Sequence, residues 1–502
     1  MSVLAESQEQ AVQTRWLRVR TTTRALATRH GLPLAVVLAA SGLAQLAVLR
    51  QGTGALIEPD SIGYLTVARQ VAAGQLTDPR RTPGYPAFLD VIQALGTLVH
   101  HASLRSVVLV QAALMVGAAV TLYALVYLLS RNRLAAAAVA ALAGLNLYIA
   151  DWERIIRVEA ISYVVAVALL LAFAWFVLAE RRAALVTVVV LSVLAILIRP
   201  NDVYFPLVML GLVALRRFRL GTLRARWKDL ALGLVAVYAV VGVYIVANGM
   251  TTGYAGLTDV TNMNAFGKVL EYHMQNETDD PRYARVRADA NAYVVSAESE
   301  HTRAFPEPFH LVEQGPMTYV DGHYALLGAY ARSIISHHPV EFALKTAPDV
   351  VAAWAASPTL YYAPFTRSSW WTSALLGISQ LINLALWLLP LLLVVFGIGA
   401  WRHPEHPLTF VMFTLLLLAC ANVLLIAVGS YNEFYRLRAP MDFVPIMGTA
   451  LVAIELGVRA MGRRLNLVPL VSVPRRGTRR DGLASGETSE SHVSSESRET
   501  SA

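Results

Sequence analysis

The chain alternates between long apolar stretches and short polar or basic segments. A helix needs roughly 17–25 apolar residues to cross a bilayer. Ten stretches meet or approach this length: Leu32–Leu49, Val107–Leu129, Leu134–Ala150, Ala160–Ala179, Ala183–Ile198, Val203–Leu215, Leu230–Ala247, Ala374–Ala400, Pro407–Val428 and Phe443–Val458. The pattern therefore predicts an all-α polytopic membrane protein with about ten transmembrane helices. The fifth and sixth stretches are short, and a single helix kinked at "RPND" (Arg199–Asp202) is the alternative.

Basic residues favour two separate crossings over one kinked helix. "ERR" (Glu180–Arg182) precedes the fifth stretch and "RRFRLGTLRARWK" (Arg216–Lys228) follows the sixth. Basic loops remain cytoplasmic, so both segments belong on the same side of the membrane. The resulting topology has both termini in the cytoplasm. Its short inner loops hold 11 Lys and Arg residues and its short outer loops hold five, which supports this orientation.

The topology divides the chain into five parts. They are a basic cytoplasmic N-terminus (1–31), an N-terminal transmembrane module (32–247) with a first outer loop (51–104), an extracytoplasmic loop domain (248–373), C-terminal transmembrane helices (374–462) and a cytoplasmic tail (463–502). The first apolar stretch follows 31 polar and basic residues and lacks a small-residue cleavage site, so we expect an uncleaved anchor. The first outer loop contains "SIGYLTVARQV", which predicts an amphipathic helix. The end of the tail, "RRDGLASGETSESHVSSESRETSA", is poor in apolar residues and is expected to be disordered.

Composition agrees with a membrane protein and narrows its chemistry. Of 502 residues, 56% are hydrophobic and 15% are charged, whereas soluble domains have about 25% charged residues. The net charge is +8, and the basic residues cluster beside apolar stretches, so we expect membrane lipids and no nucleic acid as partners. The single cysteine, Cys420, excludes an intramolecular disulfide. No metal site or nucleotide-binding loop is predicted, because the histidine pairs lack the acidic or cysteine residues of a strong metal site and no Walker motif occurs.

Charged residues gather in four predicted outer turns. They are Asp60, Arg80, Arg81, Asp151, Glu153, Arg154, Arg157, Glu159, Arg199, Asp202, Glu433, Arg436 and Arg438. Charges near hydrocarbon usually face a protein-lined cavity. Carboxylates beside arginines suit a site that binds an anion and performs base chemistry. Simpler interpretations also exist: Asp60 as a helix N-cap, "RTPGYP" as a rigid turn, and the arginines as partners of nearby acids or lipid headgroups.

The order of motifs resembles a known family. An acid after the first span is followed by Tyr64, Ala68 and Gly74, and then by "RTPGYPAFL" (Arg81–Leu89). Glu159 begins the fourth span, "RP" ends the fifth, and "YRLRAP" (Tyr435–Pro440) precedes the last. This order is similar to that of the bacterial GT-C glycosyltransferases of the family-39, aminoarabinose-transferase and protein-mannosyltransferase type. The first loop is the most specific of these matches.

The resemblance implies an inverting glycosyltransferase in the cell membrane. Its donor would be a polyprenyl-phosphate-linked sugar, its acceptor a lipid, polysaccharide or protein, and its active site would face the extracytoplasmic side. Asp60 would be the catalytic carboxylate. The family's acidic pair is here Asp60–Ser61, which leaves open whether Glu58 or Glu159 supplies a second carboxylate and whether a divalent metal is held. No cofactor is required by the sequence.

The leaving group implied by the resemblance is a lipid phosphate, which arginine or lysine at headgroup depth should neutralise. The candidates are Arg81, Arg199 and Arg438, with Lys268 in the large outer loop as a further one, and Tyr64 and Tyr85 complete the predicted substrate contacts. Two other functions remain: a transporter or flippase for a lipid-linked substrate, and a non-catalytic assembly protein. Transporters favour charges at the membrane midplane and repeated halves, whereas here the charges lie at the outer ends of the spans.

Overall fold

The structure is a computed structural model that describes residues 29–98, 103–299, 308–313, 315–320, 322–356, 369–430 and 434–460. Within them the regular structure is helical, apart from one isolated parallel bridge between Leu56 and Ile155. After an N-terminal helix Arg29–Leu49, the α-helices are α2 (Pro59–Ala72), α3 (Gly84–Leu98), α4 (Leu104–Ser130), α5 (Arg133–Gly144), α6 (Leu147–Ala150), α7 (Glu159–Ala179), α8 (Arg182–Ile198), α9 (Phe205–Arg219), α10 (Trp227–Thr252), α11 (Val260–Glu271), α12 (Ala284–Ser299), α13 (Pro308–Glu313), α14 (Ala325–His337), α15 (Pro339–Ala355), α16 (Trp370–Asn383), α17 (Leu389–Arg402), α18 (Pro407–Gly429), α19 (Phe434–Arg438) and α20 (Phe443–Ala460). Short 3₁₀ segments are η1 (Asp151–Arg154), η2 (Pro200–Tyr204), η3 (Leu223–Ala225), η4 (Pro281–Tyr283), η5 (Leu384–Leu388) and η6 (Ala439–Met441).

Seven helices in the described part of the chain are long and apolar enough to span a membrane. They are Arg29–Leu49, α4, α7, α10, Trp370–Arg402, α18 and α20. The pair Arg133–Gly144 and Leu147–Arg154 would be an eighth span, bent by 58°. The prediction of an all-helical, multi-pass membrane protein is confirmed. The predicted number of ten is not established, because α8 and α9 have only 17 and 15 residues.

The predicted break at "RPND" is visible as an interruption between α8 and α9. Helix α8 ends at Ile198, and Arg199 is extended, with φ −138° and ψ 100°. Pro200 then begins η2, and a second proline follows the start of α9. Proline cannot donate a backbone hydrogen bond and disfavours helical geometry in the residue before it. The sequence therefore stops α8 at Arg199, beside the first outer loop.

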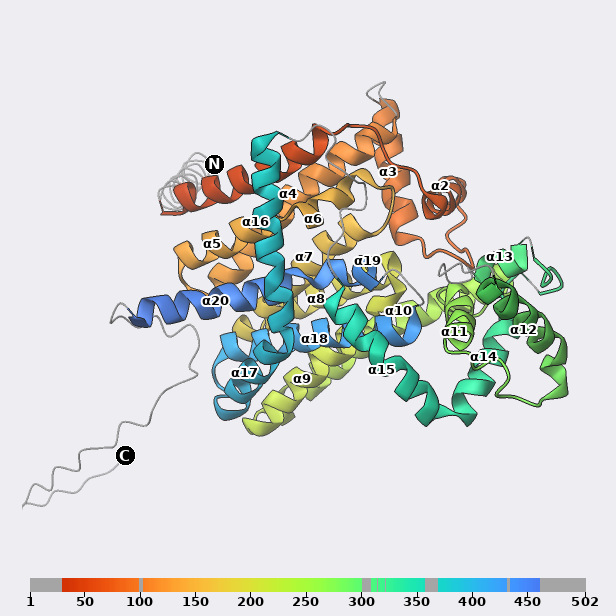
Figure 1. The fold of residues 1–502 in the computed structure, drawn as a ribbon. Helices are drawn as coiled ribbons and strands as arrows, with labels where there is room; N and C mark the ends of the chain where they lie inside the picture. Colours follow the sequence, from red (N-terminus) through yellow and green to blue (C-terminus); the bar gives the residue numbers. More distant parts are fainter. Residues whose placement is uncertain are drawn as a thin grey trace, which may run out of the picture.

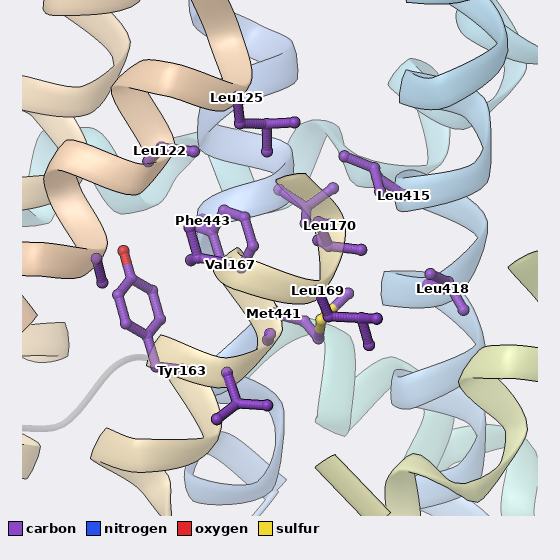
Figure 2. Close-up of a cluster of buried hydrophobic side chains, with 14 of the residues drawn as sticks. Leu122, Leu125, Tyr163, Val167, Leu169, Leu170, Leu415, Leu418, Met441 and Phe443 are labelled. Atoms are coloured by element: carbon purple, nitrogen blue, oxygen red, sulfur yellow. The ribbon is translucent and has the colours of Figure 1, made fainter. Parts of the chain in front are cut away.

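The main hydrophobic core lies between α4, α7, α18 and α20. Figure 2 shows side chains from these helices pointing toward one another, among them Leu125 of α4, Leu170 of α7 and Leu415 of α18. Tyr163 meets Phe443 edge to face, with ring centroids 5.5 Å apart. Helix α7 is buried nearly all round, as expected for the central helix of a bundle. It therefore provides a rigid base for Glu159 at its first residue.

A second core belongs to the helices between α10 and α16. Buried side chains of α11, α12 and α14, with others from the connecting segments, form a separate hydrophobic cluster. In Figure 1 α11, α12, α13 and α14 gather at one side of the molecule, away from α20. We call α11–α15 the outer helices, after the predicted extracytoplasmic loop domain in which they lie. The predicted boundaries of the loop domain remain a prediction.

Gly84 explains part of the "RTPGYP" motif. It is the first residue of α3, and a Cβ built on it would lie 2.6 Å from the backbone carbonyl of Leu197 and 2.7 Å from the amide nitrogen of Ile198. The glycine therefore allows α3 to approach the end of α8 directly. The contact brings the first outer loop against the "RPND" turn.

Gly84→Ala should destabilise the protein, because the added methyl group meets backbone that cannot rotate away. We expect a loss of about 1–3 kcal/mol, the usual range for overpacking. Thermal unfolding in detergent measures this effect. Gly117→Ala is the matched control, since a Cβ there meets no atom within 4 Å. Equal melting temperatures for the two variants would contradict the close approach.

Candidate functional site

Three arginines surround the carboxylate of Asp60. Arg81 Nη2 lies 2.6 Å from Oδ1. Arg436 Nη2 lies 2.8 Å from Oδ2, and Arg157 Nη2 lies 3.3 Å from the same oxygen. These residues come from α2, the turn before α3, the segment before α7, and α19. Four segments that are distant in sequence thus converge on one acid.

Two further carboxylates share these arginines. Glu58 Oε2 lies 2.5 Å from Arg157 Nη2, and Glu159 Oε1 lies 2.5 Å from Arg436 Nε. Three acids and three arginines make a cluster without net charge. Oε2 of Glu159 is buried and has no hydrogen-bond partner among the described residues. An unsatisfied carboxylate oxygen in a buried position is costly, and a substrate hydroxyl could satisfy it.

Backbone pairing explains why the segment before α7 lies beside α2. The amide of Leu56 donates to the carbonyl of Arg154 over 2.8 Å, and the amide of Ile156 donates to the carbonyl of Leu56 over 3.3 Å. This bridge places Arg157 next to Glu58, two residues after Leu56. Gln111 of α4 fixes the same segment, since its amide donates to the carbonyls of Glu153 and Ile155.

Asp60 is not the N-cap of α2, which removes one interpretation of the sequence. Glu58 occupies the N-cap position, and its amide donates to Ser61 Oγ over 3.0 Å. Asp60 lies in the first turn, where the helix dipole favours a negative charge. Its side chain instead meets the arginines.

The electrostatics hold Asp60 in its ionised form. Burial alone would raise its pKa, but the positive charges of Arg436, Arg81 and Arg157 outweigh burial and lower the pKa below the ordinary value. Arg81 has its own pKa raised, because Tyr64 and Asp60 outweigh the effect of burial. Asp60 is therefore a carboxylate at every physiological pH.

The accessible side of the cluster is formed by Asp60 and Arg81. Their side chains are 28% and 21% exposed, while those of Arg157 and Arg436 are 6% and 9% exposed. A ligand from solvent would meet Arg81 and Asp60 first. The other two arginines support the acid from behind.

Tyr64 and Tyr85 lie beside this accessible side. The Arg81 guanidinium stands over the Tyr64 ring, 4.6 Å from its centroid, and Tyr64 meets Tyr85 edge to face at 5.1 Å. The Tyr85 hydroxyl donates to Gln111 Oε1 over 3.1 Å. Tyr85 is fully buried, so it supports Tyr64 from below. The "Y…RTPGYP" pattern thus builds one aromatic wall of the site.

Three of the predicted phosphate ligands have other partners. Arg199 donates to the carbonyl of Leu437. Arg438 pairs with Asp442 at 2.8 Å and donates to carbonyls at the end of α15. Lys268 is fully buried and pairs with Asp349, and with Glu271 at 2.8 Å. The structure brings Asp60, Glu159, Arg81, Tyr64 and Tyr85 together, but it shows no contact between these three cations and Asp60.

Arg157 and Arg436 are the cations that the sequence prediction did not select. Both lie in the charged outer turns, and each is two residues from a selected residue, Glu159 and Arg438 respectively. Closely spaced arginines were the signal in the sequence: Arg154 and Arg157 lie three residues apart, and Arg436 and Arg438 lie two residues apart. Only the tertiary structure shows which arginine of each turn points to Asp60.

The donor set around Asp60 does not fit a divalent cation. Each of the three carboxylates is already paired with an arginine. Metal ligands need several oxygens free to converge on one point. Among the described residues, the group with suitable geometry is Glu277, His338 and Glu341, which lie between α11 and η4, between α14 and α15, and on α15.

The turn that carries Arg81 is tied to the start of the outer helices. Asp78 Oδ1 accepts the amides of Arg80 and Arg81, each over 2.8 Å. Asp259 donates its amide to the carbonyl of Pro79 over 2.7 Å, and Thr258 Oγ1 donates to the carbonyl of Arg80 over 2.8 Å. The outer helices therefore fix the position of Arg81.

Asp259 should make stability depend on pH. Its side chain is fully buried, and burial raises its pKa to about 6 despite Arg80 and His323. The unfolded chain releases this proton near pH 4, so the free energy of unfolding should fall as pH rises from about 4 to about 6. Asp259→Asn should remove this loss and raise the melting temperature at pH 7 by roughly 2–4 °C. Thermal unfolding at pH 4 is the control, where wild type and variant should differ little; a lower melting temperature of the variant at pH 7 would contradict the assignment.

Comparison with known proteins gives one family match. Residues 85–245 match the family described as dolichyl-phosphate-mannose-protein mannosyltransferase. The matched segment contains Tyr85, Arg157 and Glu159, and it begins after Asp60 and Arg81. This match confirms the resemblance to GT-C glycosyltransferases that the sequence predicted. No curated protein matches this chain.

A structural comparison finds the archaeal oligosaccharyltransferase AglB from Archaeoglobus fulgidus, solved in complex with an inhibitory peptide and a dolichol-phosphate. Sequence identity is 16% and the TM-score is 0.43. The similarity covers 85% of this chain and 51% of that chain, so this chain aligns with about half the length of AglB.

Proposed function

We propose that this protein is a membrane glycosyltransferase that moves a sugar from a polyprenyl-phosphate donor to an acceptor hydroxyl on the extracytoplasmic face. The observation that carries the proposal is the partly exposed Asp60 carboxylate of the first outer loop, held by three arginines from three different segments of the chain. The match to a glycosyltransferase family supports the reaction class. The acceptor would belong to a lipid, a polysaccharide or a protein.

The proposed reaction is a direct displacement at the anomeric carbon. Asp60 accepts the proton of the acceptor hydroxyl as the acceptor oxygen forms a bond to that carbon. The bond from the carbon to the phosphate oxygen breaks, and its electron pair goes to the leaving lipid phosphate. Attack from the face opposite the phosphate inverts the configuration. Arginine is suited to the leaving group, because a guanidinium meets two phosphate oxygens at once.

Arg81 is the proposed ligand of the donor phosphate. Of the two residues at the accessible side it is the one with a positive charge, and its side chain is the most exposed of the three arginines around Asp60. When Arg81 turns toward a phosphate, Asp60 loses one of its cations and gains a nearby anion. Both changes raise the pKa of Asp60. Asp60 would therefore become an effective base only when the donor is bound.

Arg436 and Arg157 have the supporting role in this proposal. Each joins Asp60 to a second, more buried acid: Glu159 for Arg436 and Glu58 for Arg157. They hold Asp60 in place while Arg81 changes partner. Oε2 of Glu159 is buried without a hydrogen-bond partner among the described residues, and a sugar or acceptor hydroxyl that reaches it would supply one.

Transfer by the purified protein tests the proposal. The protein in vesicles is given a polyprenyl-phosphate sugar with a labelled sugar and a mixture of candidate acceptors. We expect label to leave the lipid and appear in a glycoside of inverted configuration. Movement of intact labelled lipid between leaflets without cleavage would support the flippase alternative and overturn the proposal.

A further inference from the structure

The buried cation of the outer helices, Lys268, lies beneath the segment that carries Arg436. Its Nζ is 5.2 Å from the centroid of the Phe434 ring, and Phe434 is two residues before Arg436. Nζ also pairs with Asp349 of α15 and with Glu271 at 2.8 Å. The Tyr272 hydroxyl donates to the same Asp349 oxygen over 2.5 Å. One ammonium group thus joins α11, α15 and α19.

Helix α19 is held by contacts along its whole length, among them the Tyr435 hydroxyl, which donates to the carbonyl of Tyr148 over 3.2 Å, and Arg199, which donates to the carbonyl of Leu437. It is five residues long, too short to be stable by itself. Arg438, at its end, donates to the carbonyls of Ala353 and Trp354 in the last turn of α15 and of Ala356 just after it. Lys268 holds its beginning through Phe434. The orientation of Arg436 toward Asp60 therefore depends on the packing of α11 and α15.

The other end of α11 holds Arg81, the partly exposed arginine partner of Asp60. Thr258 and Asp259, just before α11, bind the turn of Arg81 by hydrogen bonds of 2.8 and 2.7 Å. The single helix α11 is thus linked to both Arg81 and Arg436. These two arginines make the closest contacts to the Asp60 carboxylate, at 2.6 and 2.8 Å.

We propose that Lys268 is a positioning residue, which fixes Arg436 through Phe434 and so lets the outer helices set the charge environment of Asp60. This inference rests on the proposed function for its kinetic consequence. This positioning role takes the place of the phosphate binding that the sequence suggested for Lys268, because the lysine is fully buried and its charge is already paired. A ligand that shifts α11 would then change the electrostatics at Asp60.

The test compares three variants. Lys268→Met removes the cation, but it also leaves Asp349 and Glu271 without their partner and could impair folding. Phe434→Leu keeps this ion cluster and removes the ring that connects it to α19. Lys345→Met is the control, because Lys345 pairs with exposed Glu341 and donates to the Tyr272 carbonyl without any described contact to Phe434.

The first measurement does not depend on activity. Phenylglyoxal modifies accessible arginines, and mass spectrometry gives the rate at Arg436, which is buried in the wild type. We expect Phe434→Leu and Lys268→Met to raise this rate at least about threefold, as for a locally opened segment. Lys345→Met should leave it unchanged. Wild-type rates in Phe434→Leu, or an equal increase in Lys345→Met, would overturn the proposal.

The second measurement is the pH dependence of transfer. Weaker contact with Arg436 should raise the pKa of Asp60, so kcat/KM should fall on the acid side between about pH 6 and pH 4 in the two variants and not in the wild type. We expect kcat to fall about tenfold, with a smaller change in KM for the donor. If the wild type transfers no sugar, the proposed function fails, and the rate of Arg436 modification alone decides the role of Lys268.

Discussion

Asp60→Asn is expected to lower the rate of sugar transfer by about 10²–10⁴-fold, the usual contribution of a positioned general base. Asparagine has nearly the same shape, but it cannot accept the proton of the acceptor hydroxyl. The variant also leaves Arg81 with one fewer negative partner, so the donor phosphate should bind at least as well as in the wild type. The loss should therefore appear in kcat and not as a higher KM for the donor.

Initial rates of transfer at several donor concentrations measure both constants. Asp90→Asn is the matched control, because Asp90 is an acid of the same outer loop on the neighbouring helix α3. A wild-type kcat in Asp60→Asn would exclude a catalytic role for this carboxylate. Loss of helix α2 cannot explain a decrease, since Glu58 and not Asp60 occupies its N-cap.

The sequence was sufficient to predict several members of the site. Glu159 directly precedes an apolar stretch, and Asp60 and Arg81 lie in the loop between the first two stretches, so the predicted topology places all three on the same side of the membrane. Their chemistry then follows from the cost of placing charges near hydrocarbon. For this reason Asp60, Arg81 and Glu159 could be selected as candidates from the sequence alone.

The choice among the remaining arginines was not accessible from the sequence. Arg199 and Arg436 both follow outer ends of apolar stretches, but only Arg436 points to Asp60, whereas Arg199 is held by the carbonyl of Leu437. The direction of an arginine in a short turn depends on carbonyls and acids from distant segments. The contact of Lys268 with Phe434 has the same origin, because α11 and α19 are far apart in sequence.

Helix number shows a different limit of sequence patterns. The basic flanks predict two crossings for α8 and α9, and the structure does contain two helices interrupted at Arg199. Their lengths of 17 and 15 residues nevertheless fall at or below the lower end of the range that spans a bilayer. Hydropathy alone does not decide such cases, since neighbouring helices can cover a short span.

Arg436→Met is expected to affect both stability and activity, because Arg436 joins two acids at once. Its removal leaves Glu159, which is only 4% exposed, without its cation. Removing one partner of a buried ion pair typically costs about 3–5 kcal/mol, since the remaining charge stays in a poorly solvated place. A large decrease in melting temperature and near loss of transfer should follow.

The double variant Arg436→Met/Glu159→Gln separates the two effects. A neutral glutamine removes the unpaired buried charge, so the double variant should recover much of the lost melting temperature. Transfer should remain low, because Asp60 still lacks its second arginine. Arg80→Met is the surface control: its pair with Glu313 spans 3.6 Å with both side chains half exposed, and such pairs contribute about 0–1 kcal/mol. If Arg436→Met were as stable as Arg80→Met, the ion cluster would not support the site, and if the double variant regained full transfer, Arg436 would act only through Glu159.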